Sequence, residues 1–346
     1  MDKDLKNKTL TQLQSLITKL GSKKYLAKYI FSFIHEKNAC DISKISSLGK
    51  DFRNQLVEQG YYISQLKTIK IFKDPDGTVK FLFEMADKKR IETVLLFEGK
   101  RRTLCVSTQV GCAMNCSFCA TAKLKLDRNL TTAEITDQVN TVFKQRYKIT
   151  NIVFMGMGEP LQNYDNLIRA IEILNHPAGK NIGIRHLTVS TCGLVPQITK
   201  LANEQTNPIL AVSINAPDND IRNKIMPVNK KYPLEKLFKA LQNYQYKTKQ
   251  RITFEYVLIK RLNDNLKDAQ LLAKKLKNIR CNINLIEFNP HPGCKLTASD
   301  TKTIETFAQY LRKAGIETTI RLKKGQKIKA ACGQLGAGWL KGKQKP

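Results

Sequence analysis

Acidic residues are scarce in this sequence. Its 346 residues include 29 Asp and Glu against 59 Lys and Arg, which gives a formal net charge of +30 at pH 7. An excess of this size attracts polyanions, of which nucleic acid is the commonest in a cell. The alternative is a general lysine bias, in which solvated lysines bind nothing. The ends carry much of the charge: residues 321–346 have eight Lys or Arg and no acidic residue, and residues 1–50 have ten against four. This distribution predicts two basic faces of an RNA-binding groove.

Long apolar runs are also missing. No run reaches the roughly 18 residues that a membrane-spanning helix needs. The first residues, MDKDLKNK, lack the apolar stretch of a secretory signal. These absences argue against a membrane-spanning or secreted protein, so we expect a cytoplasmic protein with no membrane contact.

Histidine is rare, whereas cysteine is not. The four histidines, His35, His176, His186 and His291, have no spacing typical of metal ligands. Nine cysteines in a long chain without a secretory signal argue against a disulfide scaffold and for metal binding or catalysis. Hydrophobic residues make up 42% of the sequence, enough for a sizeable core.

The first hundred residues divide into helical and strand-like parts. Apolar residues recur at helical spacing in three segments of residues 1–60, the last ending at Gly60, so we predict a small N-terminal helical accessory domain. Residues 61–100 contain alternating strand-like runs on either side of DPDG, which predicts a β-hairpin connector.

From about residue 101, strand-like and helical segments alternate six times. Such a series predicts a parallel sheet with right-handed crossovers. Six units are too few for a closed eight-stranded barrel, so the sequence predicts an α/β fold with a partial (β/α)6 barrel over residues 101–320. Residues 321–346 form a basic C-terminal segment. Functional residues are expected at the carboxyl ends of the strands.

Three cysteines follow the first strand of this barrel in a C-x3-C-x2-C motif: Cys112, Cys116 and Cys119. Three thiolates in one loop can hold three corners of a [4Fe-4S] cluster. No fourth cysteine follows nearby, which leaves one iron open to bind S-adenosylmethionine (SAM). Two other interpretations are a structural zinc site, which usually needs a second ligand pair, and three unrelated buried cysteines.

Several polar or glycine-rich segments end the following strands and are candidates for SAM contacts. Glycines in Met155–Pro160 permit close approach of the backbone to a ligand. The other candidates are Ser190, Ser213–Asn215 and Asn289–Pro290. Each one alone is equally typical of a turn or a helix cap, and only their common position at one rim favours a binding site.

The motifs together resemble the RlmN/Cfr family of radical SAM RNA methyltransferases. The resemblance covers roughly residues 80–336 and rests on RRTLCVSTQVGCAMNCSFCATAK, FMGMGEPLQN, RHLTVSTCG, MPVNKKYP, EYVLI, NLIEFNP and AACGQL. It implies a radical SAM barrel, one [4Fe-4S] cluster, SAM, and an RNA substrate.

The resemblance also implies a role for each matching residue. Cys332 matches the cysteine that becomes methylated, Cys105 its resolving partner and Glu92 the proton acceptor. Cys112, Cys116 and Cys119 match the cluster ligands. The matching SAM-binding positions are Gly158, Glu159, Ser190, Ser213, Ile214, Asn215 and Asn289. At Asn215 the family commonly has His, and the asparagine amide still donates and accepts hydrogen bonds.

The implied reaction uses two SAM molecules per turnover. Adenine C2 is too electron-poor to attack the methyl group of SAM directly, so the methyl group passes first to Cys332 and then, by radical chemistry, to the RNA. A disulfide between Cys105 and Cys332 releases the product. The implied partners are 23S rRNA and tRNA, an electron donor such as flavodoxin, and a thiol reductant. We expect a monomer.

Alternatives remain at this point. Pro160, in GMGEP, favours methylation of adenine C2 over C8, which the resistance branch of the family performs. An RNA methylthiotransferase would need more cysteines before the cluster motif than Cys40 and Cys105. A non-enzymatic RNA-binding protein with an iron–sulfur or zinc site would not need the GMGEP rim. Four cysteines have no assignable role: Cys40, Cys192, Cys281 and Cys294.

Overall fold

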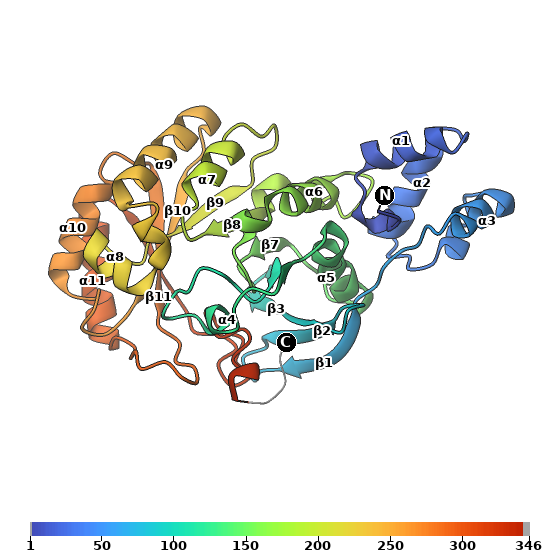
Figure 1. The fold of residues 1–346 in the computed structure, drawn as a ribbon. Helices are drawn as coiled ribbons and strands as arrows, with labels where there is room; N and C mark the ends of the chain where they lie inside the picture. Colours follow the sequence, from blue (N-terminus) through green and yellow to red (C-terminus); the bar gives the residue numbers. More distant parts are fainter. Residues whose placement is uncertain (1, 342–346) are drawn as a thin grey trace.

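The computed structural model describes residues 2–341, and a ten-stranded sheet forms its centre (Figure 1). The strands follow the order β1-β2-β3-β4-β7-β8-β9-β10-β11-β12. Their bounds are β1 Lys67–Lys73, β2 Val79–Glu84, β3 Arg90–Glu98, β4 Arg101–Cys105, β7 Asn151–Phe154, β8 Leu187–Thr191, β9 Ile209–Ser213, β10 Ile252–Leu258, β11 Cys281–Glu287 and β12 Glu317–Arg321. A separate two-stranded sheet joins β5 (Gln109–Val110) and β6 (Arg128–Asn129).

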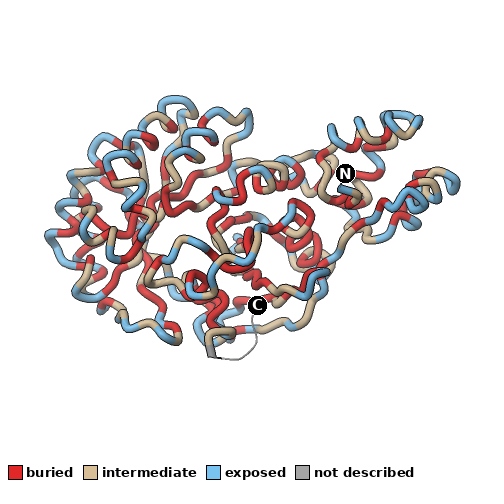
Figure 2. The backbone as a smooth tube through the Cα atoms, viewed as in Figure 1, coloured by how far each residue is buried: buried red, intermediate tan, exposed pale blue. Residues whose placement is uncertain are grey.

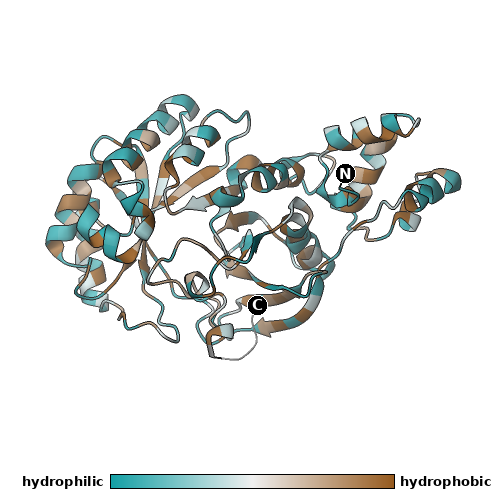
Figure 3. Ribbon diagram, viewed as in Figure 1, coloured by the Kyte–Doolittle hydropathy of each residue, from teal (hydrophilic) through white to brown (hydrophobic). Residues whose placement is uncertain are grey.

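The six predicted βα units are confirmed, and with them the partial barrel. Strands β4 and β7 to β12 are parallel neighbours. The longer helices that follow the strands are α5 Thr132–Lys144, α6 Tyr164–Asn175, α9 Leu234–Thr248, α10 Leu266–Leu276 and α11 Thr301–Lys313; α4 Ala120–Lys123, α7 Val195–Leu201 and α8 Asn219–Ile225 are short. Their hydrophobic sides face the sheet and their hydrophilic sides face outward (Figure 3).

The structure adds β12, a seventh parallel strand that the sequence pattern did not predict. Its sequence is ETTIR, and only Thr318 in it is buried. Since most of its side chains remain partly exposed, the strand lacks the apolar alternation by which strands are recognised in a sequence. It extends the parallel sheet to residue 321 and directs the chain toward the site.

The predicted hairpin continues the same sheet. Strands β1 and β2 pair antiparallel around the turn at Asp74–Thr78, where the Asp74 N–H donates to the Thr78 carbonyl at 2.8 Å. Strand β3 then pairs antiparallel with β2 and with β4, the first barrel strand. Residues 61–100 are therefore bonded to the barrel along a full strand, in addition to connecting it to the N-terminal helices.

The N-terminal helices have a hydrophobic core of their own. They are α1 (Leu10–Lys19), α2 (Leu26–His35) and α3 (Lys50–Glu58). A capping box between Thr9 and Gln12 begins α1, since each side chain accepts the other residue's backbone N–H. The core of this part includes Phe31 and reaches Ile173 of α6, so the helices also pack against the barrel.

Buried residues lie mainly along the strands and the inward faces of the helices (Figure 2). One core extends from Leu66 to Leu335, and a smaller cluster around Met226 and Phe288 lies beside the strand ends. Within residues 2–341, no helix is both long enough and apolar enough to cross a membrane. The last five residues of the predicted basic C-terminal segment, 342–346, lie outside the described residues.

Candidate active site

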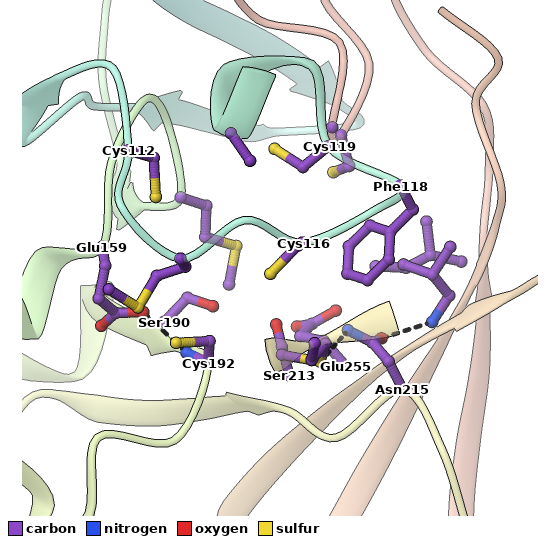
Figure 4. A pocket seen from close by; sticks show the side chains of 18 of the residues that line it. Cys112, Cys116, Phe118, Cys119, Glu159, Ser190, Cys192, Ser213, Asn215 and Glu255 are labelled. Atoms are coloured by element: carbon purple, nitrogen blue, oxygen red, sulfur yellow. Dashed lines mark hydrogen bonds between the residues drawn. The ribbon is translucent and has the colours of Figure 1, made fainter. Parts of the chain in front are cut away.

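A pocket opens at the carboxyl ends of the parallel strands (Figure 4). Its empty volume, including the part open to solvent, is about 970 Å³, which is at the upper end of the range for small-molecule sites. It brings together ten of the predicted site residues: Cys112, Cys116, Cys119, Gly158, Glu159, Ser190, Ser213, Asn215, Asn289 and Cys332. Cys105, Glu92 and Ile214 do not line it.

The loop that carries the three clustered cysteines is fixed by its backbone. The Cys112 N–H donates to the Lys125 carbonyl at 3.2 Å, and the Cys119 N–H donates to the Cys116 carbonyl at 3.2 Å. Gly111 has φ +74°, and a Cβ there would lie 1.6 Å from the Lys125 carbonyl oxygen. The loop therefore has room only for glycine at this point, directly before the first thiol.

The three thiols suit a cationic iron–sulfur group. Burial raises the pKa of Cys112 to about 12 and that of Cys116 well above its usual range, and the nearby thiols raise both further. Burial also raises the pKa of Cys119. Three thiolates so close together need a positive group among them, which the iron of a [4Fe-4S] cluster supplies. In the described part of the chain, no three His, Cys, Asp or Glu side chains form a site for a single metal ion.

The segment after β7 forms one wall of the pocket. Gly158 has φ +99°, and a Cβ there would lie 2.5 Å from the Gln109 Cβ. Glu159 is buried, and its two carboxylate oxygens accept the N–H groups of Leu161 at 3.1 Å and Cys192 at 2.8 Å. Burial raises the pKa of Glu159. Its carboxylate thus joins the ends of β7 and β8 while lining the pocket.

Ser190 and Ser213 line the floor of the pocket at the ends of β8 and β9, and Asn215 follows them. Asn215 adopts φ +53°, a left-handed conformation that asparagine tolerates better than most residues. Its Oδ1 accepts the Val257 N–H at 2.8 Å, and its Nδ2 lies 3.3 Å from the Met226 sulfur. Ile214 contributes only backbone groups: its N–H donates to the Glu255 carbonyl and its carbonyl accepts from Arg222.

Asn289 and Cys332 lie together on the opposite side of the pocket. The Asn289 amide donates to the Cys332 carbonyl at 3.2 Å and accepts from the Gln326 amide at 3.2 Å. Asn289 therefore contacts the segment that carries Cys332, besides lining the pocket. The Cys332 side chain is exposed, whereas the cluster-motif cysteines are mostly buried.

Cys105 lies at the end of β4, opposite Val94 and Val153 of the neighbouring strands. The pKa of Cys105 is raised to about 12, mainly by burial and also by the Cys332 sulfur, while the Arg321 guanidinium acts in the opposite direction. The tertiary structure thus brings Cys105 and Cys332 close enough to influence each other. All nine cysteines, which lie within the described residues, are free thiols.

Glu92 lies on β3, behind the pocket wall. Its Oε1 pairs with the Lys80 ammonium at 2.8 Å, and its Oε2 accepts the Gly336 N–H at 2.8 Å. Both side chains are buried. In this conformation both carboxylate oxygens are engaged, one with the hairpin and one with the C-terminal part of the chain.

The structure adds residues that the motifs did not indicate. Glu255 of β10 lines the pocket, and its Oε2 lies 3.6 Å from the Arg321 guanidinium of β12. Cys192 also lines the pocket; its position directly after the third strand is a signal that the sequence offered. Fully buried Arg222 donates to the carbonyls of Ile214 at 3.0 Å and Cys192 at 2.6 Å, which ties the strand ends together.

Comparisons with known proteins agree with this site. The sequence matches the radical SAM superfamily over residues 106–273 and the ribosomal RNA large subunit methyltransferase N-terminal domain over residues 3–61. It is 43% identical over 332 residues to the dual-specificity RNA methyltransferase RlmN of Geotalea uraniireducens, covering 96% of both chains. A probable RlmN of Dictyoglomus thermophilum is 42% identical over 338 residues, covering 96% of this chain and 97% of that one.

A solved structure is similar over nearly the whole length. The crystal structure of a radical SAM methyltransferase from Sphaerobacter thermophilus superposes with a TM-score of 0.91 at 41% identity, and the match covers 97% of this chain and 100% of that chain.

Proposed function

Because this chain belongs to the RlmN family of radical SAM RNA methyltransferases, we propose that it methylates carbon 2 of adenine in 23S rRNA and in tRNA. The observation that carries the proposal is the position of Cys332. Its exposed thiol lines the same pocket as Cys112, Cys116 and Cys119. A methyl group on that thiol would stand inside the cofactor pocket and still be accessible to a substrate.

In this proposal the pocket holds both cofactors. Cys112, Cys116 and Cys119 bind one [4Fe-4S] cluster, and SAM lies along Gly158, Glu159, Ser190, Ser213, Asn215 and Asn289. Ile214 supports this site indirectly, because its backbone N–H and carbonyl bond to Glu255 and Arg222. When bound, the cluster and SAM supply an organic radical that removes a hydrogen atom from the methyl group on Cys332. Two SAM molecules are used per turnover, because the methyl group itself comes from the first.

The protein side chains perform the remaining steps. Cys332 carries the one-carbon unit to C2 of the adenine. The resulting radical adduct then loses one electron, which the oxidised cluster would accept, and loses the C2 proton to Glu92, whose carboxylate must first release Lys80 or the Gly336 N–H. Cys105 then attacks the Cys332 sulfur: an S–S bond forms as the S–C bond breaks, and the electron pair remains on the product carbon, which takes up a proton to become the methyl group. Each cycle leaves one disulfide, so a thiol reductant must supply two electrons. The cluster also needs an electron donor, such as flavodoxin. We expect a monomer acting in the cytoplasm.

Nucleoside mass spectrometry of rRNA and tRNA from a deletion strain tests this function. We expect 2-methyladenosine to disappear from both RNAs and to return when the wild-type gene is supplied. A strain complemented with the Cys332→Ala variant is the matched control and should remain unmethylated. Loss of 8-methyladenosine instead would assign the chain to the C8 branch, and unchanged RNA would refute the proposal.

A further inference from the structure

The segment of residues 322–337, here called the C-terminal loop, carries Cys332. It leaves β12, which is one edge strand of the sheet, and crosses to β1 and β2 at the other edge. Figure 1 draws the last described residues, in red, near α4 and the hairpin. The loop therefore spans the open side of the partial barrel, and its contacts decide where Cys332 lies.

The hairpin turn holds the loop before Cys332. Asp76 accepts the Gly325 N–H at 2.7 Å, and Asp74 accepts the Lys327 N–H at 3.0 Å. Each aspartate uses its second oxygen within the turn, where Asp74 accepts the Asp76 N–H at 3.2 Å and Asp76 accepts the Thr78 N–H at 2.8 Å. Both carboxylates thus bridge the turn and the loop, through charge-assisted hydrogen bonds of the stronger kind.

Close approach at this contact depends on a glycine. Gly325 has φ +68°, and a Cβ there would lie 2.9 Å from the Thr78 Cγ2 and 2.8 Å from the Ala330 Cβ. Both the backbone conformation and the space therefore suit glycine alone. The loop is fitted closely onto the turn.

A second contact holds the loop on both sides of Cys332. The Lys80 ammonium donates to the Lys329 carbonyl at 3.3 Å and pairs with Glu92, whose other oxygen accepts the Gly336 N–H at 2.8 Å. Lys80 and Glu92 are buried, so water competes little for these bonds. The turn of the hairpin thus holds the loop at residues 325 and 327, Lys80 of β2 holds it at residue 329, and Glu92 of β3 holds it at residue 336.

The loop meets the cluster-motif segment on its other side. The Ala120 N–H donates to the Gly333 carbonyl at 2.7 Å, and the Thr121 hydroxyl donates to the Leu335 carbonyl at 2.8 Å. Gln334 donates to the Pro290 carbonyl at 2.9 Å. Cys332 therefore lies where the loop passes between the hairpin and the cofactor pocket.

We propose that the β1–β2 hairpin positions Cys332 for methyl transfer, with Asp74 and Asp76 as the positioning residues that hold the C-terminal loop. The inference rests on the proposed function, because it gives Cys332 the role of methyl carrier. It assigns a part in the reaction to a hairpin that does not line the pocket and acts through the C-terminal loop. When the hairpin contact is lost, the thiol is still present, but its segment is held by the remaining contacts, which include Asn289 and the cluster-motif residues Ala120 and Thr121, so its position at the pocket is less well defined.

The test compares the wild-type holoenzyme with Asp74→Ala/Asp76→Ala. Asp87→Ala is the matched control, because Asp87 lies in the next turn of the same sheet and accepts from Arg128 and from the Lys89 N–H. Hydrogen exchange of the RNA-free holoenzyme should be roughly tenfold faster over residues 325–336 in the double variant and unchanged in the control. The ratio of methylated RNA to 5′-deoxyadenosine should fall about tenfold in the double variant, while SAM cleavage continues.

A conservative pair of variants separates positioning from misfolding. Asp76→Asn keeps one acceptor oxygen for either the Gly325 or the Thr78 N–H, so its hydrogen-exchange protection and its ratio of methylated RNA to 5′-deoxyadenosine should lie between those of the wild type and of Asp76→Ala. The proposal is overturned if the double variant has the wild-type rate of hydrogen exchange over residues 325–336 and the wild-type ratio of methylated RNA to 5′-deoxyadenosine. It is also overturned if Asp76→Asn and Asp76→Ala give the same values of both. Failure of the proposed function would give a different result. The wild-type holoenzyme would then cleave SAM without methylating RNA, whereas hydrogen exchange would still differ between the wild type and the double variant.

Discussion

Gly158 is a single residue on which the packing of the pocket wall depends. Its φ is +99°, and a Cβ at this position would lie 2.5 Å from the Gln109 Cβ, so there is no space for a side chain. Gln109 in turn accepts the Glu159 N–H at 2.8 Å, so moving it disturbs the carboxylate beside it.

We expect Gly158→Ala to lower the free energy of unfolding by about 2 kcal/mol, because it combines backbone strain with overpacking. SAM binding should weaken as well. Chemical denaturation and equilibrium dialysis measure the two effects. Gly183→Ala is the control, since its Cβ would lie 3.4 Å from the His186 ring, and it should differ little from wild type. Equal stability of the two variants would contradict the argument.

The two thiols outside the cluster motif should behave differently when removed. Cys332→Ala should abolish both protein and RNA methylation, because the methyl group has no acceptor. Cys105→Ala should still methylate Cys332 and add it to the adenine, and then stall, since no thiol can attack the bridging sulfur. Gel analysis under denaturing conditions should reveal covalently bound RNA that nuclease removes. Normal turnover of Cys105→Ala without bound RNA would leave that residue a packing cysteine.

Release of the product should depend on pH through Cys105. Because burial raises the pKa of Cys105 to about 12, only a small fraction is thiolate near neutral pH. Below that pKa the thiolate fraction increases about tenfold for each unit of pH, so the release rate should increase as pH rises from 7 to 9. Rapid-quench measurement of release from the covalent adduct tests the direction.

Arg321 should modulate the same step. Its positive charge lowers the pKa of Cys105, so Arg321→Met should slow release at every pH in this range. Arg251→Met removes an exposed arginine that pairs with Glu317, and it serves as the control. A release rate independent of pH, or equal effects of the two substitutions, would refute the role of thiolate formation.

At the scale of elements, a buried ion pair joins the N-terminal segment to α5. Lys6 lies 2.6 Å from Asp137, and both side chains are 1% exposed. Asp137 also accepts the Leu66 N–H at 2.7 Å, where the chain enters β1. The contact therefore links the N-terminal helices, the hairpin and the barrel at one point.

Removing one partner of this pair leaves a buried charge without compensation. We expect Lys6→Met to lower the free energy of unfolding by about 3 kcal/mol. Lys200→Met, in an exposed pair with Asp165, should cost less than about 1 kcal/mol. Urea denaturation followed by circular dichroism gives both values, and similar losses in the two variants would show that burial of the pair is unimportant.

At the scale of the whole molecule, the net charge of +30 predicts RNA binding that weakens steeply with salt. If about six phosphates of a single-stranded substrate are contacted, the log–log slope against salt should be about −4. Filter binding to an rRNA fragment over a range of salt concentrations measures it. A flat response would mean that the lysines are only solvated.

Two triple-lysine variants test which surface of the protein contacts the RNA. Lys23, Lys24 and Lys28, at the start of α2, are exposed, and so are Lys267, Lys274 and Lys277 around α10. Glutamine at the first three positions should reduce the slope by about 2, whereas glutamine at the second three should leave it unchanged. Equal effects would indicate that the charge acts without a defined binding face.

The sequence by itself determined the parts that depend on neighbouring residues. Cys112, Cys116 and Cys119 lie within eight positions, so their spacing alone predicts a common loop, and the alternation of strands and helices predicts six βα units. The glycine-rich segment at Gly158 follows its strand directly. These signals are local, and the structure brings all of them to one rim.

Only the tertiary structure decided which residues from distant parts of the sequence lie near this rim. Cys332 and Cys105 are 227 positions apart (332 minus 105), and Asp76 and Gly325 are 249 apart. Their meeting requires the sheet to curve until its two edges face each other, a consequence of strand twist summed over ten strands. No local pattern encodes that sum, which is why the hairpin looked like a connector in the sequence and holds the Cys332 loop in the fold.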